Sequence, residues 1–144
     1  MNLLAIKQTN LYGLEKDFDE FVKLYNKRKL PNKILLSGQK GIGKSTLCYH
    51  LINFILSKDE DYSYDLKNHI INNDNRSFKL IKNGVHPNFF LIDIKPDKKF
   101  IEINQIRALI ENLNKSSFNQ NPKFILIDNI EFLNLNSINA LLKS

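Results

Sequence analysis

The octet at residues 38–45, Gly-Gln-Lys-Gly-Ile-Gly-Lys-Ser, constrains the fold of this 144-residue chain more than any other feature. In this pattern Gly38 and Gly43 let the backbone bend around phosphate oxygens, Lys44 reaches the terminal phosphates, and the Ser45 hydroxyl is available to Mg²⁺. A short apolar run before the octet predicts a buried strand, and helical spacing of apolar residues after it predicts a helix. A strand, a glycine loop and a helix together place phosphates at a helix N-terminus, which favours anions. The octet therefore predicts a nucleoside triphosphate site.

Strand and helix patterns alternate along the rest of the chain. The expected strands are residues 32–37, 89–94 and 123–128, and the expected helices are residues 14–29, 45–56, 103–114 and a last one through Leu141. Such alternation is typical of a parallel sheet covered by helices. Residues 57–86 are polar and show no strong period, so the pattern assigns no element to them. The sequence therefore predicts one α/β domain with a parallel sheet.

The third expected strand ends in an acidic residue, Asp128, after four apolar residues. An Asp at a strand tip helps to hold Mg²⁺ in phosphate-loop enzymes, so Ser45 and Asp128 are the candidate metal ligands. In hydrolytic members with an acidic pair, a Glu beside this Asp polarises the attacking water. This chain has Asn129 there, and an amide is a much poorer proton acceptor than a carboxylate. We therefore expect binding of the Mg-nucleotide with weak or absent hydrolysis, and we assign no catalytic residue.

Charge and composition narrow the class of protein. The net charge of +6 and the pI near 9.4 fit a protein that works near nucleic acid, although scattered lysines are also typical of an ordinary solvated surface. No apolar run approaches the length of a membrane span, and no secretory signal pattern opens the chain. The single Cys48 excludes an internal disulfide and a multi-cysteine zinc site. We therefore expect a cytoplasmic protein without membrane contact.

Several segments resemble the clamp-loader AAA+ ATPases, and among them the delta-prime family of bacterial DNA polymerase III fits best. The matching segments are residues 29–38, 40–44, 86–88, 103–107, 127–129 and the run Asn139-Ala140-Leu141-Leu142-Lys143. The resemblance runs from about Leu11 to Ser144. It implies a P-loop NTPase (AAA+) fold, a three-layer α/β/α sandwich with a parallel sheet, over residues 1–144. It also implies an incomplete domain, truncated before the sensor strand and without the lid and collar domains.

The resemblance adds further residues to the expected nucleotide site. It implies that Leu11 and Tyr12 lie near the adenine base and that Gly41 belongs to the phosphate loop. It also implies that Thr46 assists at the phosphates and Mg²⁺. Arg107 is a candidate DNA phosphate contact, with an ordinary surface arginine as the alternative.

The cofactors implied by the resemblance are ATP and Mg²⁺. No zinc is expected, because residues 57–86 lack the four cysteines that hold zinc in many clamp-loader subunits. The role of this stretch is left open by the sequence.

The implied function is that of an ATP-binding subunit in a hetero-pentameric clamp loader. Its partners would be the other loader subunits, the sliding clamp and, indirectly, primed duplex DNA during replication. The alternatives are an active motor ATPase of the same loader (gamma/tau-like) or another P-loop replication or repair ATPase. A motor subunit should have the acidic pair and the four cysteines, and this sequence has neither. A phosphate-loop kinase would need an arginine-rich lid, which is not visible.

Overall fold

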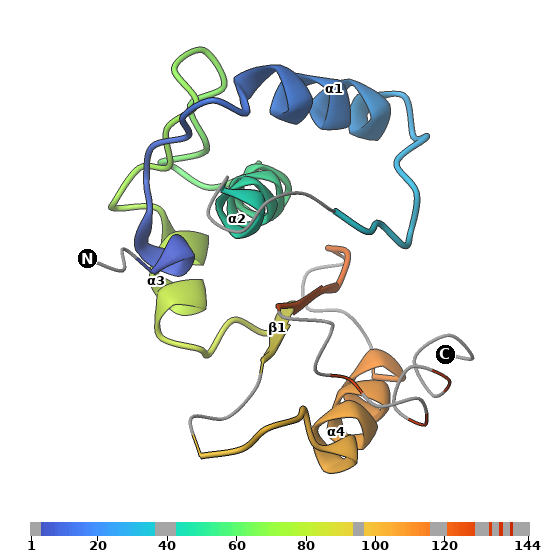
Figure 1. Ribbon diagram of the computed structural model, residues 1–144. Coiled ribbons are helices and arrows are strands. Elements are labelled where there is room, and N and C mark those ends of the chain that lie inside the picture. The colour runs from blue at the N-terminus through green and yellow to red at the C-terminus, as the bar shows by residue number, and fades with distance from the viewer. Residues whose placement is uncertain are drawn as a thin grey trace. The chain divides into compact units, whose positions relative to one another are not determined.

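The computed structural model describes residues 4–36, 43–93, 97–115, 121–128, 133, 136 and 139. The chain divides into two compact units, residues 1–83 and residues 84–144. The elements with described bounds are η1 (Ala5–Lys7), α1 (Glu15–Asn26), α2 (Lys44–Leu56), α3 (Arg76–Lys82), β1 (Phe89–Ile92), α4 (Ile103–Leu113) and β2 (Phe124–Ile127), as Figure 1 shows.

Helix α1 confirms the helix expected near residues 14–29, with a shorter C-terminal end. Phe18 and Val22, one turn apart, form its buried face. The helix ends because Arg28 takes a left-handed backbone conformation, with φ of 58°. The N–H of Arg28 then donates to the Tyr25 carbonyl, and the N–H of Lys29 donates to the Leu24 carbonyl. These two bonds make a Schellman end in which an arginine occupies the position usually held by glycine.

Helix α2 is the centre of the first unit. Most of its side chains are buried, among them every residue from 49 to 56. A helix that is apolar on nearly all sides must be covered on nearly all sides. The Phe18 ring of α1 packs edge-on against Phe54 of α2, with centroids 6.4 Å apart, and lies 5.1 Å from the Tyr64 ring. These aromatic contacts join α1, α2 and the segment that follows α2.

The polar stretch after α2 contains a short helix, α3, which the sequence pattern did not predict. The Asn75 side chain caps it by accepting a hydrogen bond from the Phe78 N–H at 2.8 Å. The Glu60 carboxylate accepts from both the N–H and the hydroxyl of Ser77, at 2.9 and 2.5 Å. With Phe78 and Ile81 buried, α3 is fixed by packing on one face and by side-chain hydrogen bonds at its start.

Two fully buried asparagines connect this stretch to α2. The Asn53 amide donates to Asn75 Oδ1 at 3.0 Å, and the Asn75 amide donates to the Tyr62 carbonyl at 2.9 Å. Ser57 donates to Asn53 Oδ1 at 3.3 Å and accepts from the Tyr64 N–H at 3.2 Å. Buried amides are costly unless they are hydrogen-bonded, so this set is a specific cross-link and not a solvated loop.

The second unit contains the described sheet. Strands β1 and β2 pair in parallel, with Phe89 opposite Phe124 and Ile92 opposite Ile127. They confirm two of the expected strands and their parallel sense, each shorter than expected. Helix α4 confirms the helix expected at residues 103–114. The buried core of this unit comprises Ile92, Ile101, Ile106, Leu109 and Leu133.

The strand expected at residues 32–37 is wrong over its described part. Residues 32–36 have no strand assignment, and Ile34 and Leu35 are 44 % and 73 % exposed. A strand depends on ladder hydrogen bonds to a neighbour, and the described sheet consists of β1 and β2. An apolar run by itself does not make a strand. Of the last expected helix, Asn136 and Asn139 are helical, and its other residues lie outside the described part.

The described residues therefore form a small α/β structure with a two-stranded parallel sheet and four α-helices of known bounds. None of these helices is both long and apolar enough to cross a bilayer. The three-layer sandwich implied by the family resemblance stays a prediction.

Candidate nucleotide-binding site

Gly43 opens the helix on which the sequence places the phosphates. Its backbone is left-handed, with φ of 94° and ψ of 21°, a conformation that side-chain-bearing residues rarely adopt. The first hydrogen bond of α2 runs from the Leu47 N–H to the Gly43 carbonyl at 2.9 Å. The amides of the three residues between them therefore lie at the helix N-terminus, and Gly43 has no side chain that could cap them. Gly43 therefore bends the backbone directly before the helix, as the motif predicts for its last glycine.

Lys44, Ser45 and Thr46 form the first turn of α2, and all three are half-buried. The positive end of the helix dipole lies at this turn, so anions are favoured there. The other loop residues of the prediction, Gly38 and Gly41, lie outside the described residues. The structure thus describes the helical half of the expected phosphate site.

A second segment lies beside this turn. A Cβ built on Gly43 would lie 3.6 Å from Leu14 Cδ1, so the Leu14 side chain, just before α1, lies near Gly43. In that segment Leu11 is buried and Tyr12 is 73 % exposed. The Leu11 N–H donates to the His69 carbonyl at 3.3 Å, which fixes the turn. The Tyr12 ring is therefore accessible in the segment before α1, and its placement near an adenine base stays a prediction.

The remaining predicted residues belong to the second unit. Asp128 directly follows β2 and is half-buried, and its N–H donates to the Ile92 carbonyl at 2.9 Å. It thus lies at the carboxyl end of the parallel pair, where ligands of α/β sheets bind. Asn129 lies outside the described residues, and Arg107 is exposed on α4. Because the two units are described separately, the pairing of Ser45 with Asp128 around Mg²⁺ stays a prediction.

The first unit contains a buried His–Tyr pair that the sequence pattern did not predict. His50 Nδ1 lies 2.7 Å from the Tyr64 hydroxyl, and His50 Nε2 lies 3.0 Å from the Gln8 carbonyl. A carbonyl can only accept, so Nε2 carries the proton and Nδ1 accepts from Tyr64. Burial lowers the pKa of His50 to about 4, against the opposing effect of the bond to Gln8. Burial also raises the pKa of Tyr64.

Both partners of this pair are therefore neutral near neutral pH, which suits a structural cross-link. The two residues are 14 positions apart in no recognisable motif, so only the fold reveals the pair. Elsewhere in the described ranges, no group of three or more His, Cys, Asp or Glu side chains is arranged to hold a metal ion.

The family model and the individual relatives that resemble this chain agree on one family. A family model described as "DNA polymerase III, delta subunit" matches residues 13–144. DNA polymerase III subunit delta' of Pseudomonas aeruginosa is 28 % identical over 110 residues, which are 76 % of this chain and 32 % of that protein. The subunits of the same name from Buchnera aphidicola and Escherichia coli are 26 % and 23 % identical over 131 residues each.

The latter two alignments cover 90 % and 91 % of this chain, and 38 % and 37 % of those proteins. The chain thus spans about a third of the length of the curated relatives it matches. The family model, in contrast, extends over nearly all of this chain. The chain therefore belongs to the DNA polymerase III delta subunit family and is delta-prime-like.

Proposed function

We propose that this chain is the nucleotide-binding part of a clamp-loader subunit and that it holds Mg-ATP at the start of α2. The observation that carries the proposal is the left-handed Gly43 placed directly before Lys44 and Ser45. A helix that begins on such a glycine presents its first amides to an anion. The names of the relatives, all DNA polymerase III subunits, supply the replication context.

In this proposal each residue at the helix start has a separate role. The Lys44 ammonium binds the terminal phosphates, and the Ser45 hydroxyl and the Asp128 carboxylate hold Mg²⁺, with Thr46 alongside. Tyr12, exposed in the segment before α1, covers the adenine base together with Leu11. Bound Mg²⁺ would neutralise phosphate charge, and the amides at the start of α2 would orient the triphosphate.

Hydrolysis is expected to be weak or absent. Asn129 stands where a catalytic Glu would polarise water, and an amide does not accept a proton at neutral pH. The subunit would then respond to nucleotide binding without acting as a motor. Changing Asn129 to Glu should raise turnover only when a partner subunit supplies an arginine finger.

The proposed partners are the other subunits of a hetero-pentameric loader, the sliding clamp and, indirectly, primed duplex DNA. The proposed compartment is the cytoplasm, where replication of a bacterial chromosome takes place. Arg107 is exposed on α4 and stays the candidate for a DNA phosphate contact. It is proposed as an auxiliary contact, since a single arginine adds little to an interaction made mainly by other subunits.

The test compares Lys44→Ala with Lys58→Ala, which removes an exposed lysine just beyond the other end of α2. Losing a charge-assisted contact to phosphate costs about 1.5–3 kcal/mol, which is roughly ten- to a hundredfold in affinity. We expect this loss for Lys44→Ala, measured with a fluorescent ATP analogue and Mg²⁺, and no comparable loss for Lys58→Ala. Equal binding by the parent and Lys44→Ala would refute the assignment.

A further inference from the structure

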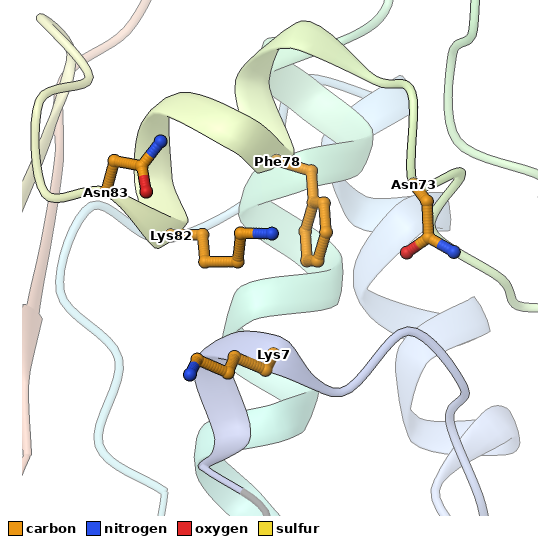
Figure 2. Close-up of a pocket in the computed structure, with 5 residues that line it drawn as sticks. All are labelled: Lys7, Asn73, Phe78, Lys82 and Asn83. Carbon is orange, nitrogen blue, oxygen red and sulfur yellow. The ribbon is translucent and has the colours of Figure 1, made fainter.

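The first unit contains a pocket that the proposed ATP site does not use. It has a volume of about 380 Å³ and is lined by Lys7, Asn73, Phe78, Lys82 and Asn83. Figure 2 shows Phe78 and Lys82 projecting from α3, Lys7 on η1 across from them, and the two asparagines on either side. A pocket of this size is within the range of small-molecule sites.

The charge on this pocket has one sign. Two of its five lining residues are lysines and none is a carboxylate. Lys7 and Lys82 take part in none of the ion pairs found among the described residues, whereas Lys79, also on α3, pairs with Asp74 at 3.8 Å. Two ammonium groups on one concave surface repel each other and attract an anion.

The position of one ammonium group is partly fixed. Lys82 Nζ lies 5.3 Å from the centroid of the Phe78 ring, within the range of a cation–π contact. Phe78 itself is only 5 % exposed. The ring therefore cannot stack on a ligand with its full face, and it acts as an apolar floor that orients the Lys82 ammonium. Recognition in this pocket is consequently ionic and polar.

The walls of the pocket are held by hydrogen bonds to the rest of the unit. Asn72 Oδ1 accepts from the Asp74 N–H at 2.8 Å, and the Asn72 carbonyl accepts from the Asn75 N–H at 3.0 Å, which shapes the turn that bears Asn73. The Ile71 N–H donates to the Thr9 carbonyl at 2.9 Å, which ties this turn to the segment after η1. The backbone that bears Asn73 is thus held in place, which lowers the entropic cost of binding at this wall of the pocket.

We propose that this pocket is a second anion site that binds the phosphate of a nucleotide unit, either free or within a single nucleic-acid strand. Lys7 and Lys82 bind the phosphate oxygens, because ammonium groups donate several hydrogen bonds to an anion. The amides of Asn73 and Asn83 can both donate and accept, which suits sugar hydroxyls and base edges beside the phosphate. The pocket volume exceeds that of one phosphate and accommodates such a neighbour.

The experiment uses the full chain in a Lys44→Ala background, so that phosphate binding at the start of α2 is already weakened. The test variant is Lys7→Gln/Lys82→Gln. Its matched control is Lys58→Gln/Lys67→Gln, which removes the same charge from exposed lysines of the same unit that do not line the pocket. The probes are a short fluorescein-labelled oligothymidylate, followed by anisotropy, and ADP without metal, followed by backbone amide NMR.

If the phosphate comes from a strand, the test variant should bind the oligonucleotide at least about tenfold more weakly, with the control within about twofold. The slope of the logarithm of the binding constant against the logarithm of the salt concentration should also become shallower by about 1.4, which corresponds to the loss of two phosphate contacts on a single strand. If the phosphate comes from a free nucleotide, ADP alone should shift the amides of Asn73, Lys82 and Asn83. Both results support the site and tell the two sources apart.

Two results would overturn the proposal. In the first, the test variant binds the oligonucleotide as tightly as its Lys44→Ala parent and ADP leaves these amides unshifted; in the second, the control variant loses as much binding as the test variant. Should Lys7→Gln/Lys82→Gln fail to fold, Asn73→Asp replaces it. This change adds a negative charge at an exposed position on the pocket wall. Undiminished binding by Asn73→Asp would also exclude a phosphate at this site.

Discussion

Acidification should destabilise the first unit through a single buried histidine, His50. Its side chain has no exposed surface, and its ring nitrogens are bonded to Tyr64 and to the Gln8 carbonyl. The pKa of His50 is about 4 in the folded chain, against an ordinary value of 6.5, because burial disfavours the charged ring. Protonation would place a charge in the core and remove the acceptor that the Tyr64 hydroxyl needs.

The direction of the effect follows from where the proton binds. Between pH 6.5 and about 4 the unfolded chain carries the His50 proton and the folded chain does not. Stability from this group is therefore complete above the unfolded pKa and is lost as the pH falls through this window. One pKa unit corresponds to about 1.4 kcal/mol, so the difference between the two pKa values of His50 lowers the free energy of unfolding by about 3 kcal/mol in total as the pH falls. About 2 kcal/mol of this stabilisation should be lost by about pH 5.

Urea unfolding followed by circular dichroism at several pH values would measure this loss. His50→Asn removes the titrating group and should flatten the dependence between about pH 7 and pH 5, at a lower absolute stability. Tyr64→Phe should destabilise at every pH by roughly 1–3 kcal/mol, since it leaves His50 Nδ1 buried without a donor. An equally steep pH dependence in the parent and in His50→Asn would refute the reasoning.

Four further substitutions test the packing and the backbone of the two units, each by urea unfolding. Arg28→Gly should raise the free energy of unfolding by up to about 1 kcal/mol by relieving a left-handed residue, and a decrease would count against the Schellman end. Gly13→Ala should lower it by about 1 kcal/mol through backbone strain alone, because a Cβ there meets nothing within 4 Å; an unchanged value would contradict the φ of +81°. Asn75→Ala should lower the free energy of unfolding by roughly 2–4 kcal/mol, because the α3 cap is lost and buried polar groups are left without partners. A loss below about 1 kcal/mol would argue against the hydrogen-bond network of Asn53 and Asn75. Ile106→Ala should lower the free energy of unfolding by about 2–5 kcal/mol because its side chain is fully buried. A smaller effect would mean that the core of the second unit is loosely packed.

Much of the fold follows from local sequence patterns. The helical spacing around Phe18 and Val22 predicts α1, and the apolar runs that become β1 and β2 predict a parallel pair. The run at residues 32–37 fails because a strand depends on a neighbour distant in sequence, which a local pattern does not report. Helix α3 is short, and its stability comes from Asn75 and Glu60, whose partners become visible only in the folded chain.

The candidate site, too, is predicted only in part by local sequence patterns. The octet predicts a glycine bend before a helix, and Gly43 has the required left-handed backbone. No local pattern encodes that the Leu14 side chain lies near this glycine, which only the folded chain shows. The pocket between Lys7 and Lys82 likewise joins residues 75 positions apart, so no spacing rule could find it.

The amides at the start of α2 provide the most direct test of the central claim. Backbone amide NMR, recorded with and without Mg-ATP, reports on Gly43, Lys44 and Leu47 individually. The account predicts that Mg-ATP shifts these resonances strongly and slows their hydrogen exchange, and that Lys44→Ala needs roughly ten- to a hundredfold more nucleotide for the same effects. Resonances at the start of α2 that stay unchanged at saturating Mg-ATP would show that this helix does not hold the triphosphate.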